Sequence, residues 1–256
     1  MAAFSLARRL RAGETVFTAW CGLSSPLVAE ALAREGFGAV TIDQQHGLWD
    51  TAATVSAIAA IHHAGAAPIV RVPLAQFPTV SRVLDFGAEG VIAPLINTPA
   101  DARAFAAAAK FPPLGERSWG PHRAMTLGGF SDPKTYLREA NDATVTIAMI
   151  ETRTALDNLD AILATPGIDA IFVGPSDLSI ALSNGTLLDP HSPDVERALD
   201  KIVASAQKAG KIPGAYCQNA ERAVALARRG FRFCAVGSDL QFLRAGAAGE
   251  VKTLKS

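Results

Sequence analysis

The chain is poor in cysteine, and its few cysteines follow no pattern. Among 256 residues there are three, Cys21, Cys217 and Cys234, which are odd in number and far apart. No CxxC pair or Cys/His cluster is present, so the sequence argues against a disulfide framework and against a zinc site. We therefore expect three reduced thiols, buried as small apolar residues, in a cytoplasmic protein.

An excess of charge of one sign is also lacking. The 24 basic and 24 acidic residues balance, which gives no electrostatic reason to expect a nucleic acid or an anionic membrane as a partner. No apolar run reaches the roughly 18 residues that a membrane span needs. The first 13 residues carry three arginines but no apolar core of signal-peptide length. We expect a soluble protein that binds small molecules and neither nucleic acid nor membrane.

What the chain does contain is an alternation of short apolar runs and Ala-rich segments with helical spacing. The strand candidates are 16–20, 39–43, 68–72, 90–95, 144–151, 170–173, 212–217 and 233–236. The helix candidates are 26–36, 51–64, 78–87, 99–110, 153–164, 193–209, 219–229 and 239–248. Strands joined through helices pair in parallel by right-handed crossovers. Eight such units in a chain of this length favour one (β/α)8 TIM barrel domain over residues 1–256, rather than an open doubly wound sheet.

Residues 111–130 interrupt this alternation. The segment contains prolines and glycines, and a further helix is expected over 133–140. We expect a long loop that returns to the catalytic end of the barrel. That path would make Arg117, Ser118, His122 and Arg123 candidates to reach a ligand; the alternative is a solvated loop or a subunit interface.

Polar residues end or follow five of the expected strands: Trp20, Asp43, Arg71, Glu151 and Asp177. Barrel enzymes place their sites at the carboxyl ends of the strands. Because packing does not require charged residues there, their convergence on one end of the barrel predicts an active site.

Glu151 and Asp177 follow adjacent strands, so their carboxylates should lie on one rim. Two neighbouring carboxylates repel each other unless they share a proton or a cation lies between them. A magnesium- or manganese-type ion suits such a pair and leaves positions open for substrate. The alternative is structural: Asp177 would cap a helix and Glu151 would form an ion pair.

Arg71 lies within an apolar strand, where a buried guanidinium needs an anion. That anion is either structural, such as Asp43 or Glu151, or a substrate carboxylate or enolate, and we favour the substrate. His46 follows Asp43 by three residues, and an adjacent carboxylate would fix its tautomer and make it a general base. No lysine ends an expected strand, which argues against a Schiff base.

These residues occur within motifs of a known family. The motifs are IDQQHG at 42–47, Arg71, LDFGAEGV at 84–91, IET at 150–152 with ALDNL at 155–159, and GPSDLS at 174–179. With them the chain resembles the HpcH/HpaI aldolase/citrate lyase family, the class II pyruvate aldolases, over about residues 6–247.

The resemblance implies a barrel of the phosphoenolpyruvate/pyruvate-domain type. It also implies reversible aldol cleavage of a 4-hydroxy-2-oxo acid to pyruvate or hydroxypyruvate plus an aldehyde. Glu151 and Asp177 would bind Mg²⁺, Mn²⁺ or Co²⁺, His46 would be the base, and Arg71 would stabilise the enolate.

Further roles follow from the same resemblance. The Ser176 backbone N–H would hold the substrate carboxylate, with Gly174 and Trp20 also binding substrate and Asp43 counted among the catalytic residues. Asp85 would reach a neighbouring subunit's site and support its histidine. The resemblance also implies a homohexamer, built as a trimer of dimers that exchange their C-terminal helices.

The chain also departs from the family pattern. Gln45 replaces a usual glutamate, Met149 replaces a common glutamine, and residues 115–120 replace a usual Gly-x-Arg-Gly-x-Gly loop. Two alternatives to an aldolase stay open: an acyl-CoA lyase of the citrate lyase β or malyl-CoA lyase type, and a non-catalytic barrel scaffold.

Overall fold

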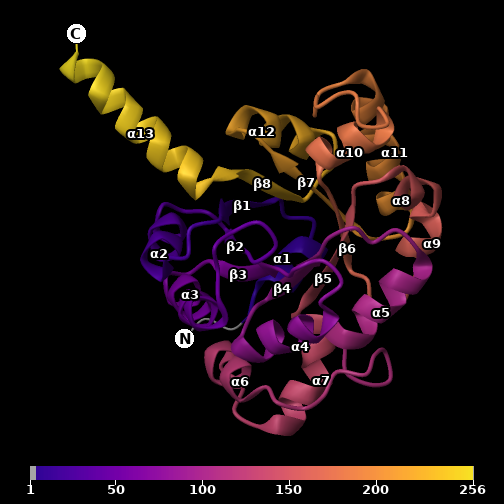
Figure 1. The fold of residues 1–256 in the computed structure, drawn as a ribbon. Coiled ribbons are helices and arrows are strands. Elements are labelled where there is room, and N and C mark those ends of the chain that lie inside the picture. Colours follow the sequence, from indigo (N-terminus) through magenta and orange to yellow (C-terminus); the bar gives the residue numbers. More distant parts are fainter. Residues whose placement is uncertain (1–3, 256) are drawn as a thin grey trace.

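The computed structural model describes residues 4–255, and it shows a closed barrel of eight parallel strands surrounded by helices (Figure 1). Each strand pairs with the next in chain order, and β8 returns to β1. The strands are β1 (Val16–Cys21), β2 (Ala39–Asp43), β3 (Ala67–Arg71), β4 (Gly90–Ala93), β5 (Val145–Ile150), β6 (Ala170–Val173), β7 (Ile212–Cys217) and β8 (Phe233–Ser238). The expected TIM barrel is therefore confirmed, and each strand overlaps its predicted range, with ends that differ by at most two residues.

The helices follow the expected positions, with three additional helices, one expected helix divided in two, and a last helix that continues beyond the predicted residue 248 to Leu254. They are α1 (Leu6–Arg11), α2 (Pro26–Arg34), α3 (Thr51–His63), α4 (Phe77–Phe86), α5 (Pro99–Ala109), α6 (His122–Gly128), α7 (Pro133–Ala143), α8 (Arg153–Asp157), α9 (Leu159–Leu163), α10 (Pro175–Leu182), α11 (Pro193–Lys208), α12 (Ala220–Arg228) and α13 (Asp239–Leu254). The short helices α1, α6 and α10 were not predicted. The single helix expected over 153–164 is two helices, which meet at Asn158.

Two apolar cores support the barrel. Inward-facing side chains of the strands, such as Ile69, Ile147 and Phe172, fill its interior together with Leu6 and Leu10 of α1. A larger core lies between the strands and the surrounding helices. All three cysteines are buried free thiols, as expected.

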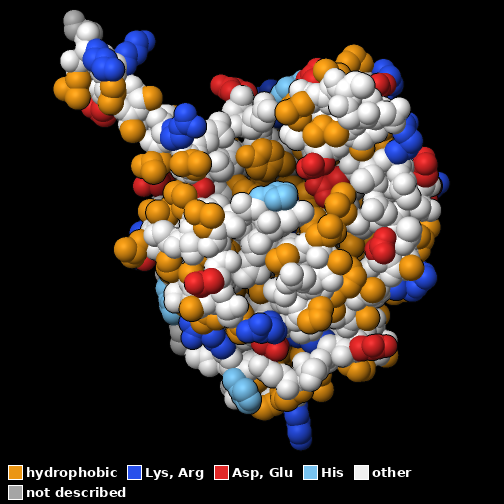
Figure 2. All heavy atoms as spheres, viewed as in Figure 1, with side chains coloured by type: hydrophobic (Ala, Val, Ile, Leu, Met, Phe, Trp, Pro, Cys, Tyr) orange, Lys and Arg blue, Asp and Glu red, His pale blue; other side chains and the backbone are white. Residues whose placement is uncertain are grey.

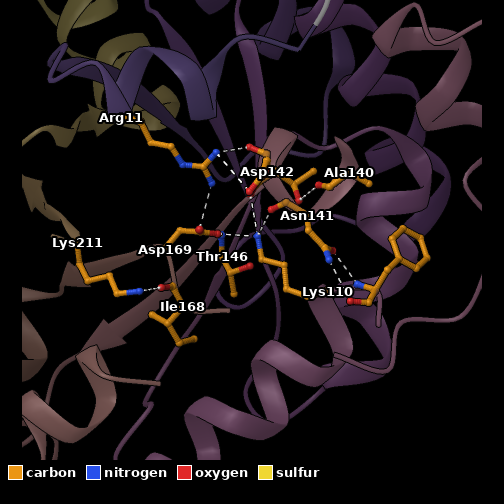
Figure 3. A network of polar contacts seen from close by, with 11 residues as sticks. Arg11, Lys110, Ala140, Asn141, Asp142, Thr146, Ile168, Asp169 and Lys211 are labelled. Atoms are coloured by element: carbon orange, nitrogen blue, oxygen red, sulfur yellow. Dashed lines mark hydrogen bonds and ion pairs between the residues drawn. The ribbon is translucent and has the colours of Figure 1, made fainter. Parts of the chain in front are cut away.

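The end of the barrel opposite the strand carboxyl ends is closed by polar contacts. Asp169 Oδ2, just before β6, accepts hydrogen bonds from Lys110 Nζ at 2.7 Å and from the backbone N–H of Thr146 at 2.9 Å (Figure 3). Arg11 at the end of α1 reaches Asp169 Oδ1 at 3.2 Å. Lys110 Nζ also donates to the carbonyls of Asn141 and Thr144, so this buried ammonium has three acceptors. These contacts tie α1, α5 and α7 to the starts of β5 and β6.

The C-terminal helix α13 leaves the barrel directly after β8 and projects away from it (Figure 1). Asp239 is its only buried residue, whereas the side chains of Leu240, Leu243, Val251 and Leu254 are exposed. Within residues 4–255 no helix combines the length and apolarity that crossing a bilayer requires.

Candidate active site

The carboxyl ends of the strands surround a cavity of about 210 Å³, which we call the mouth cavity. Histidine and acidic side chains gather near the middle of the barrel face shown in Figure 2. The lining combines polar and apolar side chains from six strands or the segments that follow them: Trp20, His46, Arg71, Met149, Glu151, Phe172, Gly174, Pro175, Ser176, Asp177 and Tyr216. Most of the residues predicted from strand ends thus meet in one place.

Glu151 directly follows β5 and is 3% exposed. Its Oε2 accepts a hydrogen bond from the backbone N–H of Leu95 at 3.0 Å. Burial, together with the charge of Asp177, raises the pKa of this carboxyl to about 7, although the Leu95 N–H and Arg71 favour the ionised form. No cation neutralises Glu151 through an ion pair within the described part of the chain, so the structural alternative, an ion-paired Glu151, is absent.

Asp177 lies in the first turn of α10, beside Glu151 in the mouth cavity. Gly174 is the N-cap residue of this helix and offers no side-chain cap. The carboxylate of Asp177 forms no hydrogen bond or ion pair with any other residue of 4–255. An added Cβ at Gly174 would collide with Glu151 Oε1, so only glycine lets α10 begin this close to the glutamate. Asp177 is therefore not a helix cap, and its carboxylate is available to a ligand.

Arg71 and Asp43 form a bidentate ion pair at the mouth. The two residues are register partners on β3 and β2, and Arg71 Nε and Nη2 donate to Asp43 Oδ1 and Oδ2 at 2.8 and 2.7 Å. The guanidinium also lies 4.9 Å from the centre of the Trp20 ring. Although Asp43 is buried, Arg71 keeps the pKa of its carboxyl below the usual value. The structural partner is thus Asp43, while Nη1 has no partner among the described residues and remains for a ligand.

His46 lies on the exposed turn after β2. Asp43 Oδ1 accepts from the backbone N–H groups of Gln45 and His46 at 3.0 and 3.3 Å. The expected contact between Asp43 and the His46 imidazole is therefore wrong, because both carboxylate oxygens are used by Arg71 and by the turn backbone. The imidazole makes no hydrogen bond to any residue of 4–255, and Gln45 Oε1 is buried without a partner.

Aromatic residues form the apolar wall of the mouth cavity. Trp20 stacks on Phe172 at 5.8 Å, meets Tyr216 edge-on at 5.6 Å, and donates through Nε1 to Asp43 at 3.2 Å. Sequence reasoning missed Phe172 and Tyr216. Tyr216 is the penultimate residue of β7, so including uncharged polar residues among the strand ends would have found it. No lysine of the described chain lines this cavity.

A family model described as HpcH/HpaI aldolase/citrate lyase matches residues 17–245. The chain belongs to this family.

Its relatives agree with that assignment. The chain is 38% identical over 235 residues, 92% of each chain, to a hydroxypyruvate/pyruvate aldolase of Rhizorhabdus wittichii. It is 34% identical over 247 residues to a 5-keto-4-deoxy-D-glucarate aldolase of Salmonella arizonae, covering 96% of this chain and 94% of the relative. A solved HpcH/HpaI family structure from Burkholderia cenocepacia superposes with a TM-score of 0.90 at 34% identity, covering 99% of this chain and 100% of the other. The protein is thus an aldolase-type carbon–carbon lyase.

Asp85 and the 111–130 segment, two further parts of the chain for which the sequence predicts roles, lie outside the mouth cavity. Asp85, near the end of α4, accepts a 2.6 Å hydrogen bond from Arg117 Nη2 of its own chain. Arg117 lies over the ring of Phe111, and Arg123 donates to the carbonyl of Val55. The expectation that the 111–130 segment returns to the catalytic end is wrong, because Arg117 and the aromatic residues around it hold the segment against α4 and α7 and none of its residues lines the cavity.

Proposed function

We propose that the protein catalyses a metal-dependent, reversible aldol cleavage of a 4-hydroxy-2-oxo acid to pyruvate or hydroxypyruvate plus an aldehyde. One observation carries the proposal: an unpaired Asp177 and a buried Glu151 share a small cavity with Arg71 and His46. The two relatives, a hydroxypyruvate/pyruvate aldolase and a 5-keto-4-deoxy-D-glucarate aldolase, support the same substrate class.

The donor set of Glu151 and Asp177 fits a hard divalent ion such as Mg²⁺, Mn²⁺ or Co²⁺. Both residues offer carboxylate oxygens, and no third His, Cys, Asp or Glu completes a cluster within residues 4–255. Two carboxylates leave coordination positions to water and substrate oxygens. Such an ion would polarise the 2-oxo group and stabilise negative charge that develops on it.

The residues around the pair would bind and orient the 2-oxo acid. α10 begins at Pro175, so the backbone N–H of Ser176 lies in its first turn, where the helix dipole favours a carboxylate. Arg71, fixed by Asp43 through two nitrogens, would direct Nη1 toward the enolate oxygen. Trp20 would cover the apolar side of the substrate, with Gly174 leaving room beside Glu151.

His46 would move the proton. In the synthetic direction it takes a proton from the methyl carbon of pyruvate, and the enolate carbon then attacks the aldehyde carbonyl. A new carbon–carbon bond forms, and the resulting alkoxide takes up the proton that His46 removed, so that the imidazole returns to its starting state. The imidazole has no partner within the described chain, and we propose that Asp85 of a neighbouring copy supports it.

A neighbouring copy would also cover an apolar groove of about 390 Å³ on the outside of the barrel. The groove lies between the segment that follows α2 and helix α12, where the last helix of a (β/α)8 barrel ordinarily packs, and Phe17, Phe37, Val224 and Val236 contribute to it. Because α13 of the same chain projects away instead (Figure 1), we propose that α13 of a second copy fills the groove in a hexamer of exchanged dimers.

An aldol assay tests the proposed function. Purified protein is treated with EDTA, and hydroxypyruvate or pyruvate is then supplied with a panel of aldehydes. We expect turnover only after Mg²⁺, Mn²⁺ or Co²⁺ is added. Full turnover without metal would contradict the Glu151–Asp177 site. Cleavage of acyl-CoA thioesters without aldol turnover would indicate the acyl-CoA lyase alternative, and no turnover of either kind would indicate a scaffold.

A further inference from the structure

Asp239, the first residue of α13, is a buried carboxylate whose contacts serve another part of the chain. It is 3% exposed, and its Oδ1 accepts from the backbone N–H of Gly22 at 3.0 Å. Its Oδ2 accepts from the N–H of Leu23 at 2.7 Å and from Cys21 Sγ at 3.2 Å. Asp239 thereby fixes residues 21–23, the segment that follows Trp20 at the end of β1.

Capping of α13 does not explain this arrangement. Ser238 is already the N-cap, and its hydroxyl accepts from the N–H of Gln241. Within its own helix the Asp239 carboxylate accepts only from the backbone N–H of Leu240, and no cation of the described chain pairs with it. Burying a carboxylate without a cation costs free energy. A residue whose only role is to begin a helix has no need to be buried, so Asp239 has a further role.

The fixed segment is in turn attached to the turn that carries His46. The carbonyl of Gly22 accepts from the N–H of Leu48 at 2.9 Å, and the carbonyl of Cys21 accepts from Trp49 Nε1 at 2.8 Å. Gly47 packs directly on Gly22, since an added Cβ at Gly47 would lie 2.9 Å from the Gly22 carbonyl oxygen. Segment 21–23 thus lies between Asp239 on one side and residues 47–49 on the other.

We propose that Asp239 is a positioning residue that fixes the His46 turn through segment 21–23. Asp43 holds the start of this turn through the N–H groups of Gln45 and His46. The contacts of Gly22 hold its end, so that the backbone on both sides of His46 is fixed. The inference rests on the proposed function, in which His46 removes the substrate proton.

Exchange of the methyl protons of pyruvate with deuterium tests this role, because exchange requires the base and the enolate but no aldehyde. Asp239→Asn keeps the side-chain volume but places an amide N–H₂ against a backbone N–H. We expect the exchange rate to fall about ten- to a hundredfold, the loss typical of a base displaced by about 1 Å. The Kd for Mn²⁺ and the KM for pyruvate should stay at wild-type values, because Glu151, Asp177 and Ser176 lie on the other side of the cavity.

Two matched variants separate positioning from stability. Asp169→Asn removes a carboxylate with comparable contacts at the opposite end of the barrel (Figure 3), so it should lower Tm but keep wild-type exchange. Ser238→Ala removes the cap of α13 beside Asp239 and should also keep wild-type exchange. If Asp239→Asn fails to fold, Trp49→Phe removes one bond between the two segments and should lower exchange in the same way.

The outcomes are distinct. Wild-type exchange in Asp239→Asn, or in Trp49→Phe if that variant has to be used, would overturn the positioning role alone. Loss of exchange that coincides with dissociation in sedimentation would assign Asp239 to assembly and also overturn it. A wild-type protein that exchanges no deuterium in the presence of Mn²⁺ would instead refute the proposed function, and the positioning role with it.

Discussion

Replacing Glu151 with glutamine should change how the stability of the metal-free protein depends on pH. The buried Glu151 carboxyl has a pKa of about 7, against an ordinary value of 4.5. The folded state holds this proton more tightly than the unfolded state. The protonated carboxyl therefore contributes to the free energy of unfolding, and this contribution is fully present below pH 4.5. It is lost as pH rises toward 7.

The size of the effect follows from these two pKa values. Each pH unit of difference is worth about 1.4 kcal/mol, so ionisation of Glu151 should cost the metal-free protein about 3 kcal/mol by pH 8. Solvent screening reduces this little, because Glu151 is only 3% exposed. Glutamine has no proton to lose. The free energy of unfolding of Glu151→Gln, relative to wild type, should therefore rise by about 3 kcal/mol between pH 4.5 and pH 8.

Urea denaturation followed by circular dichroism measures this difference. Wild type and Glu151→Gln are compared in EDTA at several pH values and at one protein concentration, because oligomer stability depends on concentration. Adding Mn²⁺ at pH 8 should then stabilise wild type but not the variant. Glu116→Gln, at an exposed position, is the matched control and should follow wild type throughout.

A constant difference between wild type and Glu151→Gln across this pH range would refute the reasoning. It would mean that the Glu151 carboxylate is hydrated or ion-paired in solution. Burial would then not destabilise its ionised form in the absence of a cation. Equal stabilisation of both proteins by Mn²⁺ would place the metal elsewhere.

Three further predictions concern the other proposed groups. Arg71→Lys should lose about 3 kcal/mol of enolate stabilisation, roughly a hundredfold in pyruvate deuterium exchange, since a point charge cannot both pair with Asp43 and reach the substrate; wild-type exchange would exclude this role. Asp85→Ala should keep the Kd for Mn²⁺ in calorimetry but lower exchange, and an active monomer in sedimentation would contradict a role across an interface. Deleting residues 245–256 should yield smaller assemblies by light scattering, and an unchanged mass would show that α13 does not hold the copies together.

The barrel could be predicted because its signals are local. β-Branched runs and the helices between them recur along the chain, and the predicted 212–217 coincides with β7. The fourth strand was predicted to reach Leu95 but ends at Ala93. Leu95 adopts a φ of 52°, and its N–H turns to Glu151. A contact with a residue 56 positions away ends the strand, and no local pattern reveals it.

The parts that escaped prediction depend on packing and register. Helix α6 lies in a segment rich in proline and glycine, and it is held by tertiary contacts such as that of Leu127 against Gly87. The partner of Arg71 could not be decided from the sequence, because it depends on the register that sets Asp43 beside Arg71 across β2 and β3. The strand-end rule found the charged residues of the mouth cavity and, extended to uncharged polar residues, would have found Tyr216, whereas Phe172 required the alternation of inward-facing side chains.

The distribution of lysine has a practical consequence for an enzyme that handles reactive aldehydes. Aldehydes condense with free amines, and no lysine of the described chain lines the mouth cavity. Burial lowers the pKa of Lys110, which would make it a reactive amine if it were accessible, but it is 1% exposed and its ammonium has three acceptors. Coupling the protein to an aldehyde-activated resin would therefore consume surface amines such as Lys208 and leave the cavity open. The immobilised protein should withstand aldehyde concentrations that inactivate an enzyme with a lysine nucleophile.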